Sequence, residues 1–413
     1  ISLFKLPTVE EKCEITMTDI KIEQATVLKR LNSLAVTKSM GPDGLHPRIL
    51  KELSNEIADI VTNLFQESVD SRTVPRLWKK AIVTAIHKKG SKAEPSNYRP
   101  ISLTCILCKV LENIIRLHIV DHLQLNDQIC NEQFGFIPKQ SATLHLINVI
   151  DEWMSVMDEG GNINVIYCDI MKAFDQVPIN RLLRKVKSYG IKGSLLAWIG
   201  SFLKNRKMSV VINGDKSSEG SVTSGVPQGS VLGPLLFAIY INDMPIGINS
   251  LLFMFADDTK LFREIKNEDD NAYLQKDFDE LSDWSGKWKL KFHPEKCTVL
   301  HLGKTNGKTP YELNGQVLQA SSSEKDLGVQ IDDELRFDKH IQAKTSKARQ
   351  IWGMIRRSFT NIDTETFPLL FKALVRPHLE YANCVWSPRF QDQIDDIERV
   401  QRSATKQVPG LQN

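Results

Sequence analysis

Phe255-Ala-Asp-Asp258 is the stretch that decides the fold of this 413-residue chain. It lies between the apolar run 251–255 and a second run that ends at Leu261 and Phe262, so it predicts a β-hairpin with two adjacent carboxylates at its tip. A plain turn is the alternative, but tight hairpins favour Asn-Gly or Asp-Gly because their turns need positive φ. Adjacent carboxylates beside a buried strand also repel each other. A bound cation would account for both features.

The second informative stretch is Val165-Ile-Tyr-Cys-Asp-Ile-Met-Lys-Ala-Phe-Asp175, in which an apolar strand ends on Asp169. By itself, Asp169 could simply be the N-cap of the following segment. Considered together with the hairpin, however, two central strands each deliver carboxylates to one edge of a sheet. This pattern is typical of a two-metal site, in which two cations hold the attacking and leaving oxygens of a phosphoryl transfer. The all-oxygen ligand set favours Mg²⁺.

The composition is that of a globular protein, with 41% hydrophobic and 25% charged residues, and the length predicts two or three subdomains. The net charge of +3 is distributed unevenly. Residues 71–116 contain 10 Lys and Arg against 2 Asp and Glu, and residues 336–413 contain 13 against 8. Two basic zones around a more acidic middle suit a nucleic-acid backbone with divalent cations, although lysine-rich faces are often only solvated.

The seven cysteines are odd in number and scattered, which predicts a reducing, intracellular environment. Cys105 and Cys108 form a lone C-x-x-C pair in an apolar stretch, so we expect buried thiols rather than metal ligands. No signal peptide opens the chain and no run reaches the roughly 20 apolar residues that span a bilayer, so membrane insertion is not expected. The chain begins at Ile1 and stops at Asn413 just after a helical pattern, and we therefore expect a fragment of a longer polypeptide.

Helical and strand patterns alternate along the chain, which indicates the α+β class. Periodicity predicts helices within 20–34, 49–64, 107–123, 179–189, 227–243 and 271–288, and across most of 338–413. Strands are expected at 81–86, 165–168, 208–212, 298–302 and 328–331, with a strand pair at 252–262. In the helix expected from Pro227, Gly229 and Gly233 would each cost about 1 kcal/mol against Ala. We therefore expect another backbone to approach these two glycines.

Given these two stretches, the chain resembles the reverse transcriptases of non-LTR retrotransposons, of the LINE type and similar to jockey-like and chicken-repeat-like elements. Phe255 to Asp258 matches the family's F/Y-x-D-D box, and Asp169 to Asp175 matches its D-x-x-x-A-F-D motif. Further matches are, in chain order, Gly41-Pro-Asp-Gly44, Asn97-Tyr-Arg-Pro-Ile-Ser102, Gln133-Phe-Gly-Phe136 and Ser224-Gly-Val-Pro-Gln-Gly-Ser-Val-Leu-Gly-Pro-Leu-Leu-Phe237. The ordered motifs extend from about Gly41 to Ile331, which makes their joint occurrence far more specific than any single one.

The resemblance implies a right-hand polymerase fold, in which fingers, palm and thumb surround the template. It places an N-terminal extension at 1–75, fingers at 76–165, a palm built on an antiparallel sheet at 166–335, and a partial helical thumb at 336–413 that we expect to be truncated. A part near 179–222 would belong with the fingers. Basic thumb residues could follow the duplex phosphates, or could be only solvated; they are Lys344, Lys347, Arg349, Arg356 and Arg357.

The resemblance also implies roles for individual residues of the metal site. The family's metal ligands correspond to Asp169, Asp257 and Asp258, with the backbone carbonyl of Ile170 as a further ligand. These would hold two Mg²⁺ ions, which Mn²⁺ could replace. Lys296 corresponds to a lysine proposed to protonate the departing pyrophosphate, although an ordinary surface lysine is equally consistent with the sequence.

The nucleotide-binding residues follow from the same resemblance. Arg99 and Lys88 correspond to the basic pair on the triphosphate, and Lys89 is an equally good candidate for the lysine. Phe174 corresponds to the steric gate against a ribose 2′-hydroxyl, unless it is only a core phenylalanine. Gln228 corresponds to the glutamine that lies against the incoming nucleotide. Ala256, inside the F/Y-x-D-D box, completes the nucleotide-binding set.

The activity implied is RNA-directed DNA synthesis, in which a primer 3′-hydroxyl is extended with dNTPs. The partners would be an RNA template, a DNA primer and dNTPs, with no membrane and with an oligomeric state that the sequence does not predict. The template or primer strand would be the backbone that approaches Gly229 and Gly233. Target-primed synthesis implies a nuclear location with a cytoplasmic ribonucleoprotein stage, and the family's nicking endonuclease is expected upstream of Ile1. Two alternatives stay open: a catalytically silent, domesticated nucleic-acid-binding protein, and a group II intron-like maturase, a group that usually has Tyr at the position of Phe255.

Overall fold

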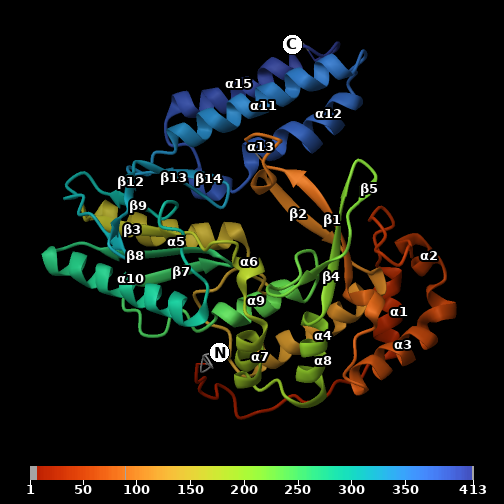
Figure 1. Cartoon of the computed structure of the whole chain (residues 1–413). Helices are drawn as coiled ribbons and strands as arrows, with labels where there is room; N and C mark the ends of the chain where they lie inside the picture. Colours follow the sequence, from red (N-terminus) through yellow and green to blue (C-terminus); the bar gives the residue numbers. More distant parts are fainter. Residues whose placement is uncertain (1–6, 89, 412–413) are drawn as a thin grey trace.

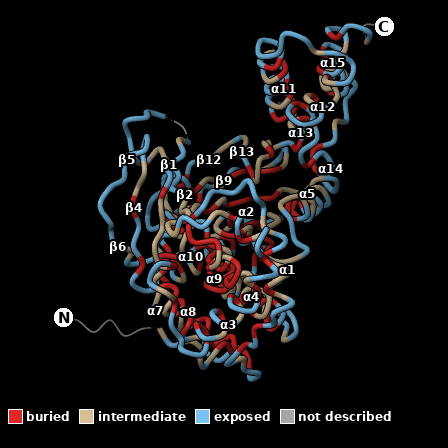
Figure 2. The backbone as a smooth tube through the Cα atoms, turned by 90° about the vertical axis from the view of Figure 1, so that its right-hand side faces the viewer, coloured by how far each residue is buried: buried red, intermediate tan, exposed pale blue. Residues whose placement is uncertain are grey.

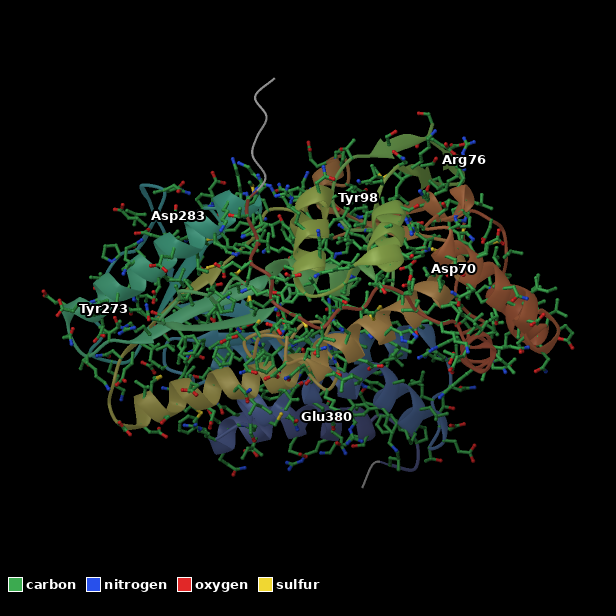
Figure 3. All side chains as sticks on the ribbon, turned by 90° about the horizontal axis from the view of Figure 1, so that it is seen from below. Asp70, Arg76, Tyr98, Tyr273, Asp283 and Glu380 are labelled. Atoms are coloured by element: carbon green, nitrogen blue, oxygen red, sulfur yellow. The ribbon has the colours of Figure 1, made fainter. Side chains whose placement is uncertain are left out.

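The computed structural model describes residues 7–88 and 90–411, apart from the side chain of Ser96. The chain forms the mixed α+β structure that the sequence predicts, with two five-stranded sheets on opposite sides of the molecule and a group of C-terminal helices above them (Figure 1). Figure 3 shows helix α10 (Glu268–Trp288), which carries Tyr273 and Asp283, along one side, whereas Asp70 and Arg76 lie at the opposite side.

The N-terminal helices form a small layer against the long helix α4 (Ile106–Leu125). They are α1 (Gln24–Asn32), α2 (Pro47–Glu52) and α3 (Ser54–Asp70), followed by a 3₁₀ turn at Arg76–Lys79. Val27, Leu31 and Phe65 are fully buried between them, as expected of the apolar face of an amphipathic helix. Helices were expected within 20–34 and 49–64, and the structure confirms them with the second split in two at Leu53.

The first sheet contains the strands on either side of the basic loop near Lys88. Its order is β2-β1-β4-β5, with β6 also paired to β4. The strands are β1 (Lys80–His87), β2 (Tyr98–Leu103), β4 (Arg206–Ile212), β5 (Asp215–Lys216) and β6 (Gly220–Val222), and a 3₁₀ turn at Pro95–Asn97 precedes β2. β1 runs antiparallel to β2 and parallel to β4. Much of this sheet is exposed, as the pale β5 and β6 in Figure 2 show.

The second sheet is the central one, with the order β12-β9-β3-β8-β7. Its strands are β3 (Ile163–Cys168), β7 (Leu251–Phe255), β8 (Asp258–Glu264), β9 (Thr298–Leu302) and β12 (Gln319–Ser321). Helix α5 (Ala142–Asp158) packs on one face through Leu146 and Trp153, and α10 packs on the other through Leu274 and Phe278. Burial on both faces explains why β3 has an almost uninterrupted apolar sequence.

Short elements connect the two sheets and complete the fold. They are α6 (Ala173–Gln176), α7 (Ile179–Ser188), α8 (Gly193–Leu203) and α9 (Gly233–Ile241), the strand pair β10 (Glu312–Leu313) and β11 (Gln316–Val317), and the pair β13 (Ser323–Asp326) and β14 (Val329–Asp332). Most of α9 is buried, and its surroundings are the largest buried region in Figure 2.

The helix predicted to begin at Pro227 begins only at Gly233, so this prediction is wrong for residues 227–232. Gly229 has φ +90°, a conformation that cannot continue a right-handed helix. A Cβ at Gly229 would lie 2.4 Å from the carbonyl oxygen of Ser102 in β2, and one at Gly233 would lie 2.6 Å from Ser230 Oγ. In this structure, atoms of the chain itself therefore fill the close approach that we had assigned to a template or primer strand.

Most of the C-terminal helices share a separate small core around Trp352, Phe367 and Val375, whereas Val385 and Trp386 pack with α5. They are α11 (Asp338–Ser358), α12 (Thr366–Leu370), a π-helical turn at Phe371–Val375, α13 (Arg376–Glu380), α14 (Asn383–Trp386) and α15 (Gln391–Thr405). The largely helical character predicted from residue 338 onward is confirmed.

Candidate active site

Three carboxylates meet at one edge of the central sheet. Asp169 follows directly after β3, Asp258 is the first residue of β8, and Asp257 lies in the turn between β7 and β8. The antiparallel register pairs Cys168 with Thr259, so the next step along the ladder brings Asp169 beside Asp258. The predicted juxtaposition of two carboxylate-bearing strands is therefore present.

The turn that carries Asp257 contains only Ala256 and Asp257, because Phe255 pairs with Asp258. Ala256 has φ +57°, a conformation that glycine adopts more readily than alanine. It is 4% exposed, and its backbone N–H donates to the side-chain oxygen of Gln133 at 3.0 Å. The tip is therefore a strained turn supported from inside the protein rather than an ordinary surface loop.

Burial and mutual repulsion disfavour the charged forms of Asp257 and Asp258 unless a cation lies nearby. Burial, with the nearby charges of Asp257 and Asp326, raises the pKa of the Asp258 carboxyl to about 6, although part of the residue is exposed. Burial also raises the pKa of Asp257, to which the charge of Asp169 adds. Oxygen ligands that repel one another in this way are suited to a hard divalent cation.

The three side chains do not form a closed metal cage. Among residues 7–88 and 90–411, no three His, Cys, Asp or Glu side chains converge closely enough to hold a metal ion alone. An ion at this edge would need further oxygen ligands, either from water or from a bound substrate. Mg²⁺ is commonly held in that manner, by one or two carboxylates together with substrate phosphates.

Two further predicted residues lie at the same edge. Lys296 Nζ is 3.4 Å from Asp169 Oδ1, with both side chains largely exposed. The backbone at Ile170 is fixed by hydrogen bonds on either side, from His293 N to Asp169 O at 2.8 Å and from Met171 N to Lys291 O at 2.9 Å. The structure thus brings Lys296 and Ile170 together with the carboxylates.

The basic residues predicted to bind triphosphate come from the first sheet. Arg99 lies on β2 opposite Ile86 of β1, and Lys88 follows β1 with its backbone N–H bonded to Asn97 O at 2.8 Å. Both side chains are exposed. Burial raises the pKa of Asp257, and the positive charge of Arg99 offsets part of that rise. Lys89 lies outside the described residues. Arg99 is therefore close enough to the carboxylate edge for its charge to act on Asp257.

Phe174 and Gln228 lie between the two sheets. The Phe174 ring stacks on Phe237 with 4.5 Å between centroids and meets Phe136 edge-on at 5.9 Å. It is only partly buried, so one part of the ring belongs to the core and another is accessible. Gln228 Nε2 donates to Asp175 Oδ1 at 2.8 Å, which fixes the orientation of its amide.

Two acidic residues accept hydrogen bonds from Gln228 and from the start of α9, and the sequence predicted a role for neither. Asp175 was quoted as part of a motif, and its contact with Gln228 appears only in three dimensions. Glu112, from α4, is 0% exposed and accepts hydrogen bonds from Val231 N at 2.7 Å and Leu232 N at 3.1 Å, at the start of α9. A carboxylate at a helix N-terminus is favourable, and a glutamate in an apolar helical stretch was the only signal in the sequence.

The cysteine pair lies in the same region. Cys105 and Cys108 are both 0% exposed, as predicted, and Cys108 Sγ donates to Glu112 Oε1 at 3.4 Å.

In the described part of the chain, no helix combines the length and the apolar character needed to cross a bilayer.

Comparison with known proteins identifies similar sequences over most of the chain. Residues 86–337 match the family model described as reverse transcriptase (RNA-dependent DNA polymerase). The chain is 28% identical over 403 residues to a probable RNA-directed DNA polymerase from transposon X-element of Drosophila melanogaster, covering 94% of this chain and 44% of the relative. It is 28% identical over 393 residues to the RNA-directed DNA polymerase from mobile element jockey of the same species, covering 91% and 43%. The chain thus spans less than half the length of these relatives.

Proposed function

The chain belongs to the reverse transcriptase family, and we propose that it is an RNA-directed DNA polymerase of a non-LTR retrotransposon. The observation that carries this proposal is the meeting of Asp169, Asp257 and Asp258 at one sheet edge, inside the segment that matches the family. Relatives from the X-element, jockey and BS elements support the choice of element class.

In this proposal the molecule is a right hand. The central sheet with α5 and α10 is the palm, the exposed first sheet belongs to the fingers, and helices α11 to α15 are the thumb. Residues 1–75 form an N-terminal extension, of which helix α1 packs on α4, and the part near 179–222 joins the fingers through β4. The basic thumb residues, Lys344 among them, would lie along the duplex backbone.

Asp169, Asp257, Asp258 and the carbonyl oxygen of Ile170 would hold two Mg²⁺ ions, with phosphate oxygens of the nucleotide as the remaining ligands. Bound there, the ions would neutralise the developing charge on the attacking and leaving oxygens. Mn²⁺ would occupy the same oxygen ligands. The raised pKa values of Asp257 and Asp258 support this assignment, because a divalent cation relieves their repulsion.

The other residues bind and orient the substrates. Arg99 and Lys88 hold the triphosphate, and Gln228, fixed by Asp175, lies against the incoming nucleotide beside Ala256. Phe174 excludes a ribose 2′-hydroxyl through the accessible part of its ring. Lys296, beside Asp169, is placed to donate a proton to the departing pyrophosphate. The RNA template and DNA primer bind between the fingers and the thumb.

The proposed setting is target-primed synthesis in the nucleus, after a cytoplasmic ribonucleoprotein stage. A longer relative such as the jockey polymerase contains segments that this chain does not cover, and nicking of the target is assigned to such segments.

The direct test measures incorporation of dTTP by the purified chain on oligo(dT)-primed poly(rA) with Mg²⁺. We expect template-dependent extension, little incorporation of UTP, and a gain of UTP incorporation in Phe174→Val. Binding of the primed template without any extension would identify a silent binder and overturn the proposal. If primer extension by the chain required RNA splicing, the chain would instead be a maturase.

A further inference from the structure

The segment around Gln133 forms an additional layer against the carboxylate hairpin. Met254 N in β7 donates to Glu132 O at 2.8 Å, and Phe134 N donates to Met254 O at 2.8 Å, so Gln133 pairs with Met254 in a parallel bridge. This short segment thus extends the central sheet beyond its edge strand. It lies within hydrogen-bonding distance of the turn that carries Asp257.

The side chain of Gln133 connects this segment to the turn. It is 2% exposed, and its Oε1 accepts two backbone hydrogen bonds, from Gly135 N at 2.7 Å and from Ala256 N at 3.0 Å. Ala256 is the residue immediately before Asp257. A single buried oxygen therefore fixes the backbone next to the predicted metal ligands.

The turn needs such support for two physical reasons. Ala256 has φ +57°, a left-handed conformation that is unfavourable for alanine. The two following carboxylates repel each other before any cation binds. Both effects would relax if the turn opened, and the hydrogen bond from Ala256 to Gln133 opposes that opening.

Gly135 allows the segment to approach this closely. A Cβ at position 135 would lie 2.3 Å from Ala256 N, closer than any real contact. The backbone of the segment is thus in direct van der Waals contact with the turn. Position 135 must stay glycine for Gln133 Oε1 to receive both N–H groups.

We propose that Gln133 is a positioning residue that holds the turn at Ala256 to Asp258 in the conformation required for binding divalent metal. It touches neither substrate nor metal, and it acts through the Ala256 N–H. This inference rests on the proposed polymerase function, and it assigns to the segment 132–136 a role in setting the metal affinity of the site.

The test replaces Gln133 with Met, which keeps a similar volume and removes the accepting oxygen. The substitution breaks no hydrogen bond of the side-chain nitrogen, because Nε2 has no hydrogen-bond partner among the described residues. We expect Gln133→Met to weaken Mn²⁺ binding, measured by electron paramagnetic resonance without nucleotide, by about tenfold or more. Amide hydrogen exchange in the peptide that spans 251–262 should accelerate, and the Mg²⁺ concentration for half-maximal extension should rise in parallel.

Gln66→Met is the matched control. Gln66 on α3 also uses its Oε1 to accept a backbone N–H from a distant segment, Ile22 N at 2.8 Å, and it lies in the N-terminal layer. Its replacement should leave Mn²⁺ affinity and exchange in 251–262 unchanged. If Gln133→Met does not fold, Gln133→Asn serves instead, because its shorter side chain withdraws the oxygen from Ala256 N.

The outcomes separate this inference from the proposed function. A wild-type chain that neither extends primers nor binds Mn²⁺ contradicts the proposed function itself. An active wild type together with a folded Gln133 variant of unchanged Mn²⁺ affinity and unchanged exchange overturns the positioning role. Loss of metal affinity in both Gln133→Met and Gln66→Met also overturns it, because a general loss of stability would then explain the effect.

Discussion

The two five-stranded sheets of this protein differ in burial although each contributes residues to the candidate site. In the two inner strands of the central sheet, β3 and β9, every residue except Tyr167 and Thr298 is buried. In the first sheet β1 has a single buried residue, Val83, and β2 has none. The carboxylates thus stand on a sheet held between two helical layers, whereas Arg99 and Lys88 stand on strands open to solvent.

This difference separates two tasks that a polymerase must perform. Ligands for metal need fixed positions, which packed strands and the Gln133 contact provide. The basic side chains that bind a triphosphate must stay solvated until the substrate arrives, and exposed strands allow this. Gly229 brings the loop before α9 against the first sheet, because it packs on Ser102 of β2 and directly follows Gln228. Substitutions should therefore affect activity and stability differently on the two sheets.

The largest effect is expected for Asp258→Asn in the central sheet. Extension should fall by at least about a hundredfold, because the variant loses a charged metal ligand. The free energy of unfolding of Asp258→Asn should rise rather than fall. The folded pKa of Asp258, about 6, lies above its unfolded value, so its charged form opposes folding, and stability is lost as pH rises through this range. Thermal unfolding at pH 7 in EDTA should show a higher Tm for Asp258→Asn, and an unchanged or lower Tm would contradict the repulsion argument.

The contact between the loop before α9 and the first sheet is tested by Gly229→Ala. Its Cβ would meet Ser102 O at 2.4 Å, and the residue has φ +90°, so we expect a loss of about 1–3 kcal/mol in the free energy of unfolding. Gly214→Ala is the control, because Gly214 has φ +94° with no atom within 4 Å of the added Cβ. Urea denaturation should show a larger loss for Gly229→Ala, together with a raised KM for dNTP. Equal losses in both variants would show that the contact between Gly229 and Ser102 contributes nothing to stability.

A smaller effect is expected for Arg99→Ala in the exposed sheet. Loss of a charge-assisted contact with phosphate should raise the KM for dNTP by about tenfold. Stability should stay within about 0.5 kcal/mol, because the side chain is exposed. Lys216→Ala, on β5 of the same sheet, should change neither quantity. Steady-state kinetics and urea denaturation of both variants measure the difference, and a strongly destabilised Arg99→Ala would remove the contrast between the sheets.

The smallest effect is a pH dependence that originates beneath the carboxylate hairpin. Burial, with the charge of Lys260 at 2.8 Å, lowers the pKa of His145 to about 2, so the folded protein holds a neutral imidazole. The unfolded chain binds a proton below its ordinary pKa of 6.5, and stability is therefore lost as pH falls. Between pH 6.5 and 5.5 this loss should be about 1 kcal/mol. His145→Gln should show a correspondingly smaller loss in urea denaturation, and equal losses in both proteins would refute the assignment.

The sequence predicted those features that depend on local pattern. The hairpin at 251–264 and the apolar strand before Asp169 follow from short runs of apolar residues, and their carboxylates follow from position at the strand ends. The start of α9 could not be predicted, because the apolar pattern continues through Pro227 while Gly229 takes a positive φ against Ser102. The hydrogen bond between Gln133 and Ala256 joins residues 123 positions apart, and no local pattern encodes such a contact.

The central claim is that the three carboxylates at the edge of the buried sheet hold the metal for DNA synthesis. It is tested most directly by comparing the wild type with Asp257→Asn for single-nucleotide extension and for binding of the same primed poly(rA) template. The account predicts that Asp257→Asn loses extension while its template Kd stays within about twofold, because the basic surfaces that bind phosphate are unchanged. Extension by Asp257→Asn at the wild-type rate, with the template bound equally well, would contradict it.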